Sequence, residues 1–116
     1  MKKFLILVRE DLKERAGHTP EQFMYNCKMV AEWIDRMAQT GNYLQADGLL
    51  AEGRYIGRNY IVTDGPFIEA KESISGFVLV LAEDMEHAAK LGRGCPLIDM
   101  GFGVVEVRPI MDVPEF

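Results

Sequence analysis

Apolar residues occupy consecutive positions in two segments of the chain, where an alternation of apolar and polar residues could have been expected. Residues 2–8 and 76–82 are each rich in Phe, Leu, Ile and Val, the residues that favour strands. Successive side chains of a strand point to opposite faces of the sheet. In both segments apolar residues occupy both faces, which is typical of strands that are buried on both sides.

Helical spacing replaces this pattern after Thr19. Thr19 and Pro20 form a strong helix start, and Gln22 stands where a capping box needs it. Apolar residues then recur at helical intervals to Ala38, and Gly41 supplies a terminator. A shorter helix is predicted after the cap Asp84, with an inner stripe that consists of Met85, Ala88, Ala89 and Leu91.

The remaining segments predict short strands and loops. Strands are expected at residues 43–50, with a bulge or bend at Asp47-Gly48, and at residues 60–63 and 103–110. Residues 12–18 are read as a polar loop. The resulting order, β-α-β-β-β-α-β, is close to the split β-α-β arrangement with one additional short strand.

Two helices can cover only one face of such a sheet. The other face would expose a large apolar surface, which is unusual on a soluble monomer. A second copy that stacks the same face against it removes this surface and forms an isologous dimer. The strand pattern by itself therefore predicts an α+β homodimer.

Length and charge restrict the function further. The chain has 116 residues, which fits a single domain spanning residues 1–116, and a net charge of −5. This charge argues against binding to nucleic acid or to an anionic membrane. The apolar run after Met1 is too short for a membrane span or a signal peptide, so a cytoplasmic protein is expected. Cys27 and Cys95 are expected to be reduced thiols.

The segment from Asp64 to Ile74 has the highest density of chemically useful residues. Asp64-Gly65-Pro66 is a turn signal, and Phe67 can anchor the turn on the core. Alternatively, the segment forms the wall of a pocket into which Asp64 and Glu72 present carboxylates. A buried carboxylate has a raised pKa and becomes an acid–base candidate.

Arg108 is a second candidate for ligand binding. It shares a strand face with Glu106, so the two side chains form either a polar pair inside a cavity or an ordinary ion pair at a sheet edge. No metal is predicted. His18 is expected to be solvated, and His87 lies among carboxylates at a helix start, which complement the helix dipole. Cys95 has no base nearby in the sequence, and a structural thiol is the simpler interpretation.

Four segments carry a resemblance to a known family. They are residues 63–72 (Thr-Asp-Gly-Pro-Phe-Ile-Glu-Ala-Lys-Glu), Ser75-Gly76-Phe77, Gly94-Cys95-Pro96 and residues 105–110 (Val-Glu-Val-Arg-Pro-Ile). Together with the first strand and the 44–50 segment, they resemble the DGPF-type branch of the YCII-related family over nearly the whole chain. The resemblance implies a ferredoxin-like monomer, with two helices on one face of an antiparallel sheet, that dimerises into an α+β barrel.

The resemblance implies little about activity. Some relatives pair a His on the first helix with an Asp before a Pro near the second helix. Here the first helix has no His and Cys95 precedes Pro96, so this dyad is absent. DGPF-type proteins are also associated with extracytoplasmic-function sigma factors, which suggests a signalling context by family association alone.

These observations lead to three hypotheses. The first is a homodimer without catalytic chemistry that binds a small ligand or a regulatory partner at the sheet-dimer cavity through Asp64, Phe67, Glu72 and Arg108. The second is a cofactor-independent enzyme that uses Asp64 or Glu72 as general acid–base. The third is a structural protein without a pocket. None of the three requires a cofactor.

Overall fold

Four antiparallel strands form the sheet at the centre of the molecule. The computed structural model describes residues 1–63 and 73–115. The sheet contains β1 (Lys2–Glu10), β2 (Tyr43–Gly48), β5 (Ser73–Ala82) and β6 (Gly103–Pro109) in the order β2-β5-β1-β6. This order is that of the split β-α-β unit, so the predicted α+β, ferredoxin-like architecture is confirmed.

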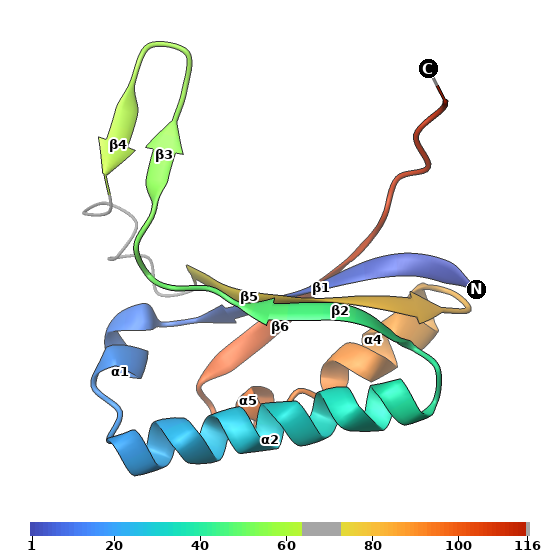
Figure 1. The fold of residues 1–116 in the computed structure, drawn as a ribbon, viewed down its shortest axis with the longest axis horizontal. Coiled ribbons are helices and arrows are strands. Elements are labelled where there is room, and N and C mark those ends of the chain that lie inside the picture. Colours follow the sequence, from blue (N-terminus) through green and yellow to red (C-terminus); the bar gives the residue numbers. More distant parts are fainter. Residues whose placement is uncertain (64–72, 116) are drawn as a thin grey trace.

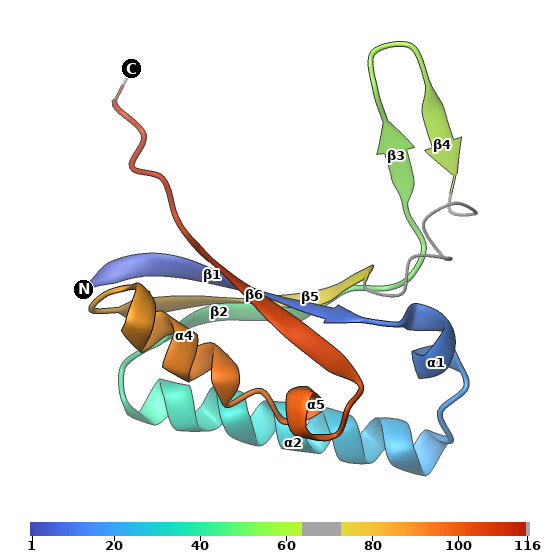
Figure 2. The ribbon, with the colours of Figure 1, turned by 180° about the vertical axis from the view of Figure 1, so that it is seen from behind.

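Helices cover one face of this sheet (Figures 1 and 2). The long α2 (Pro20–Gln39) and the shorter α4 (Met85–Arg93) are accompanied by two small helices, α1 (Leu12–Ala16) and α5 (Pro96–Asp99). On the other side of the sheet stands a hairpin of β3 (Arg54–Ile56) and β4 (Ile61–Thr63), and the C-terminal segment leaves on that side as well. Among the described strands, β3 and β4 pair only with each other.

The N-caps of α2 and α4 are the residues predicted from the sequence, Thr19 and Asp84. The Thr19 side chain accepts a hydrogen bond from the Gln22 amide at 3.1 Å, and Asp84 accepts one from the His87 amide at 2.8 Å. Gly41, with φ of 76°, ends α2 in the left-handed conformation that glycine tolerates best. The capping box is not completed, because the Gln22 side chain donates to Asn26 instead.

Four expectations about local structure are corrected. Residues 12–18 are not a loop throughout, because the Asp11 carboxylate caps the amides of Lys13 and Glu14 and starts α1. Residues 60–63 do not extend the main sheet but belong to the β3–β4 hairpin. In β2 the register shifts between Tyr43 and Gln45 and not at Asp47-Gly48. The predicted inner stripe of α4 is partly wrong, because the buried residues of this helix are Ala88 and Gly92, whereas Met85 is exposed.

The core lies between the sheet and the helices. Phe4, Ile6 and Val8 of β1 point to the helices and pair across the sheet with Val80, Val78 and Gly76. Trp33 of α2 is buried against this layer, and its indole N–H donates to the Leu91 carbonyl of α4 at 2.8 Å. This hydrogen bond ties the two main helices together.

The opposite face of the sheet carries apolar side chains in its middle and polar ones at its edges. Two cross-strand rows run from β2 to β6: Asp47, Phe77, Leu7 and Glu106, and then Gln45, Leu79, Leu5 and Arg108. The predicted alternation of apolar residues on both faces is therefore confirmed. We call this helix-free surface the open face.

Candidate functional site

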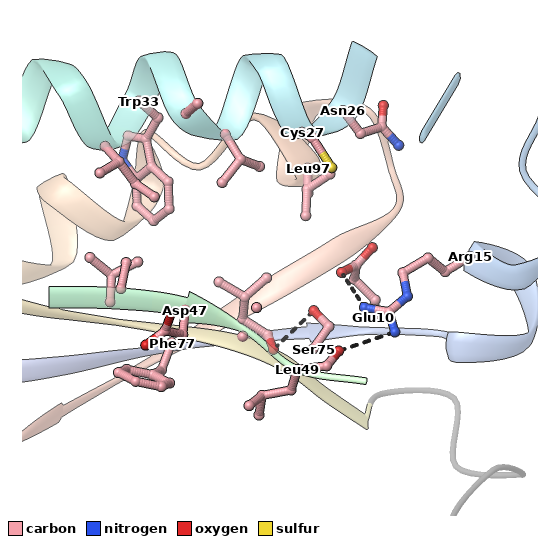
Figure 3. Close-up of a pocket in the computed structure, with 18 of the residues that line it drawn as sticks. Glu10, Arg15, Asn26, Cys27, Trp33, Asp47, Leu49, Ser75, Phe77 and Leu97 are labelled. Atoms are coloured by element: carbon pink, nitrogen blue, oxygen red, sulfur yellow. Dashed lines mark hydrogen bonds and ion pairs between the residues drawn. The ribbon is translucent and has the colours of Figure 1, made fainter. Parts of the chain in front are cut away.

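A cavity of about 570 Å³ lies between α2 and the sheet, on the helix-covered side (Figure 3). Its walls are mainly apolar and come from α2 and from three strands: Val30, Trp33 and Ile34, with Val8, Ala46 and Val78. Cavities of several hundred Å³ with apolar walls and a few polar groups are typical of small-molecule sites. This cavity is the candidate functional site.

Polar groups gather at the end of the cavity nearest α1. They are the Glu10 carboxylate, the Arg15 guanidinium, the Asn26 amide and the Ser75 hydroxyl. Arg15 Nη1 lies 3.9 Å from Glu10 Oε2, and Arg15 Nη2 donates to the Leu49 carbonyl at 3.3 Å. The Asn26 side-chain oxygen accepts from Gln22 at 2.7 Å, and the Ser75 hydroxyl donates to the Val8 carbonyl at 3.4 Å.

Glu10 is the unusual member of this group, because a carboxylate is seldom buried without a close partner, and within residues 1–63 and 73–115 its ion pair is the long one with Arg15. It is only 7% exposed. Its separation of 3.9 Å from Arg15 is longer than a charge-assisted hydrogen bond, which is usually 2.7–2.9 Å. The carboxylate therefore retains capacity to accept a hydrogen bond from a bound molecule.

Local sequence explains how these two side chains meet. β1 continues to Glu10, so Glu10 follows Phe4, Ile6 and Val8 on the face that points to the helices. Asp11 then caps α1 and turns the chain back, which places Arg15 one helical turn later beside the end of β1. The strand predicted for residues 2–8 was too short by two residues, and Glu10 was consequently missed as a site residue.

Cys27 also lines the cavity, and its sulfur points from α2 toward the sheet in Figure 3. Cys95 lies elsewhere in the core and is buried, and both cysteines are free. Burial raises the pKa of the Cys95 thiol above its ordinary value, with the Glu10 charge contributing in the same direction. Cys95 is therefore a protonated core thiol and not an activated nucleophile, as its sequence context indicated.

Three of the predicted site residues, Asp64, Phe67 and Glu72, lie outside the described residues. Arg108 lies on β6 at the edge of the open face and is exposed. It is not among the residues that line the cavity beneath α2. Its proposed role in ligand binding would therefore belong to the open face.

Arg108 belongs to an ion-pair network on that face. Its guanidinium donates to Glu106 at 3.3 Å, and Arg9 donates to the same carboxylate at 2.9 and 3.1 Å. Hydrogen bonds from Arg9 and then Arg108 lower the pKa of Glu106 below its ordinary value. The structure thus shows the ion pair of Glu106 and Arg108 on an edge strand of the sheet, and Arg9 of the neighbouring strand joins it.

The two histidines differ in environment. Nδ1 of His87 accepts a hydrogen bond from the Glu83 amide at 3.0 Å, in agreement with a role at the start of α4. The expectation of a solvated His18 is wrong. Both of its ring nitrogens are buried without a hydrogen-bond partner among residues 1–63 and 73–115. Its ring packs on that of Phe102, with the two ring centroids 4.5 Å apart.

Metal sites and membrane spans are not found in the part of the chain that the structure describes. No three His, Cys, Asp or Glu residues there are grouped so as to hold a metal ion. None of the described helices has both the length and the apolar character needed to cross a bilayer.

Comparison with known proteins identifies one family. The family model of the YCII-related domain matches residues 5–114, which is nearly the whole chain. No curated protein matches the chain.

Proposed function

The chain belongs to the YCII-related domain family. From this membership and the geometry, we propose that the protein is a cytoplasmic homodimer. We further propose that it binds a small, mostly apolar molecule in the cavity beneath α2. The Asp-Gly-Pro-Phe segment at residues 64–67 supports placement in the DGPF-type branch. This ligand site differs from the sheet-dimer cavity expected from the sequence, because the cavity lies on the helix-covered side.

One observation carries the proposal for the ligand. Glu10 places a buried carboxylate at the end of an apolar cavity, and its charged neighbour Arg15 is 3.9 Å away. A ligand that presents an ammonium or another hydrogen-bond donor at this end gives Glu10 the close partner that a buried charge requires. The apolar part of the ligand then packs against Trp33 and Val30.

Three probes with the same ring and different head groups test this site: tryptamine, tryptophol and indole-3-propionate. A ligand that binds only the folded state raises its melting temperature. We expect tryptamine to give the largest rise, tryptophol a smaller one, and indole-3-propionate the smallest because its carboxylate meets Glu10. The shift should disappear in Glu10→Gln and persist in Glu14→Gln, whose carboxylate is exposed on α1 outside the cavity. Equal shifts in wild type and Glu10→Gln would refute the site.

The open face supports the homodimer. Its two middle strands present Leu5, Leu7, Phe77 and Leu79 in adjacent rows, and charged residues lie on the edge strands and, as Arg9, near the end of β1. An apolar surface with a polar rim is the usual form of a stable interface. A second copy is the simplest partner, because the same face then covers itself.

Light scattering tests the dimer. Wild type is expected at twice the chain mass of 13.1 kDa. Leu7→Lys, in the middle of the open face, should shift it to the monomer. Met24→Lys, a matched change at an exposed residue of α2, should leave the dimer intact. A wild-type monomer at micromolar concentration would refute the proposal.

A further inference from the structure

The β3–β4 hairpin and the C-terminal segment stand away from the rest of the molecule. The hairpin arm is defined as residues 54–63 and the tail arm as residues 110–115. Both project on the side of the open face, the hairpin arm from the end of β2 and the tail arm from the end of β6 (Figures 1 and 2). The Cα radius of gyration is 15.5 Å, compared with about 13 Å for a compact domain of this length.

The hairpin arm is regular and exposes large apolar side chains among polar ones. Arg54, Tyr55 and Ile56 pair with Thr63, Val62 and Ile61, and the Gly57 amide closes the turn by donating to the Tyr60 carbonyl at 2.9 Å. Ile56 and Ile61 face each other across the pair and are 72% and 67% exposed. An isolated two-stranded hairpin is marginally stable in water, and exposed apolar groups of this size mark interaction surfaces.

The tail arm also exposes large apolar side chains. The Ile110 amide donates to the Lys3 carbonyl at 3.0 Å and anchors the start of the arm to β1. Beyond it, Met111 and Val113 are 79% and 64% exposed. Two arms with exposed apolar residues therefore extend from the two edge strands of the same sheet, at opposite ends of the open face.

We propose that the two arms pack against the flanks of a second copy of the chain that is stacked on the open face. This inference rests on the homodimer of the proposed function. Stacked sheets lie about 10 Å apart, so arms that rise beyond the face must run along the flanks of the copy above it. By the two-fold symmetry of an isologous dimer, each copy is held by both arms of the other.

The position of the arms favours a second copy over an unrelated protein. The arms flank the sheet face that the helices leave uncovered, whose central rows are apolar, and the exposed apolar residues of the arms extend this surface outward. An unrelated partner bound to the arms alone would leave Leu5 and Leu7 uncovered. A stacked copy covers the face and both arms in one interface.

Two double variants test the arms: Ile56→Ser with Ile61→Ser, and Met111→Ser with Val113→Ser. All four side chains are exposed in one chain, so the variants should fold as the wild type does. The control is Met24→Ser with Tyr25→Ser, which changes two exposed residues of α2. Dimer dissociation constants are measured by sedimentation of each protein over a dilution series.

We expect each arm variant to raise the dissociation constant at least about tenfold, and the control to change it by less than about threefold. A photo-crosslinking residue in place of Tyr55 should also yield a covalent dimer of the full-length chain. A wild-type dimer whose dissociation constant is the same in both arm variants, without a crosslink, would overturn the arm inference and leave the dimer standing. A wild-type monomer would overturn both.

Discussion

The Glu10 carboxylate and the Arg15 guanidinium lie 3.9 Å apart at the polar end of the cavity, and they are buried to different extents. The Glu10 side chain is 9% exposed and that of Arg15 is 20% exposed. Arg15 also donates to the Leu49 carbonyl. Loss of one partner should therefore affect the protein differently from loss of the other.

Glu10→Gln is expected to change the free energy of unfolding by less than about 1 kcal/mol. It removes the long ion pair but also removes a desolvated charge, and these effects oppose each other. Arg15→Met should destabilise the protein by about 2 kcal/mol or more, because it leaves the Glu10 charge buried without a cation. Urea unfolding at pH 7 measures both, and equal losses in the two variants would contradict the asymmetry.

Trp33→Phe is expected to destabilise the protein by about 2 kcal/mol or more. The change removes the indole donor and leaves the Leu91 carbonyl without the hydrogen bond observed at 2.8 Å. It also removes buried volume beside the cavity. Trp33 is the single tryptophan, so circular dichroism must replace fluorescence in the unfolding measurement. Tyr25→Phe, at an exposed position of the same helix, should be neutral.

His18→Phe is expected to keep or increase stability. The imidazole nitrogens are buried without a described partner, and an apolar ring of similar shape removes the cost of burying them. Contact with Phe102 is retained. The increase should not exceed about 2 kcal/mol. His87→Phe is the control, and it should destabilise because the Glu83 amide loses its acceptor. A lower melting temperature for His18→Phe than for His87→Phe would contradict this reading.

The Glu106 network predicts a pH dependence. Arg9 and Arg108 lower the pKa of Glu106 in the folded state below its unfolded value of about 4.3. A group with a depressed folded pKa stabilises the protein above the unfolded pKa, and this contribution is lost as the pH falls through the folded pKa. The stability difference between wild type and Glu106→Gln should therefore be constant near neutrality and decrease below about pH 4. Chemical unfolding from pH 7 to pH 3 measures it. A difference that does not depend on pH would show that the network does not stabilise the fold.

Local sequence was sufficient for the main elements because their signals act over a few residues. The caps Thr19 and Asp84 and the terminator Gly41 set the limits of α2 and the start of α4 through hydrogen bonds and backbone conformation within one turn. The apolar residues on both faces of β1 and β5 similarly predicted an apolar sheet surface on the side without helices, and the structure shows this open face. Motif resemblance added the family.

The candidate site was not predictable in the same way. Its polar end joins Glu10, Asn26 and Ser75, which come from three separate elements and have no shared spacing in the sequence. The β3–β4 pairing was missed for a related reason, because a strand pattern does not state which sheet the strand joins.

By itself, then, the sequence determined the order of the four main strands and the two main helices, the apolar character of both sheet faces and the family, since these depend on short-range periodicity, capping and motif. Only the tertiary structure decided that the cavity lies beneath α2, that Glu10 is buried in it beside Arg15, and that the hairpin and tail rise from the open face. These features depend on the packing of side chains that are distant along the chain, and such packing has no local signature.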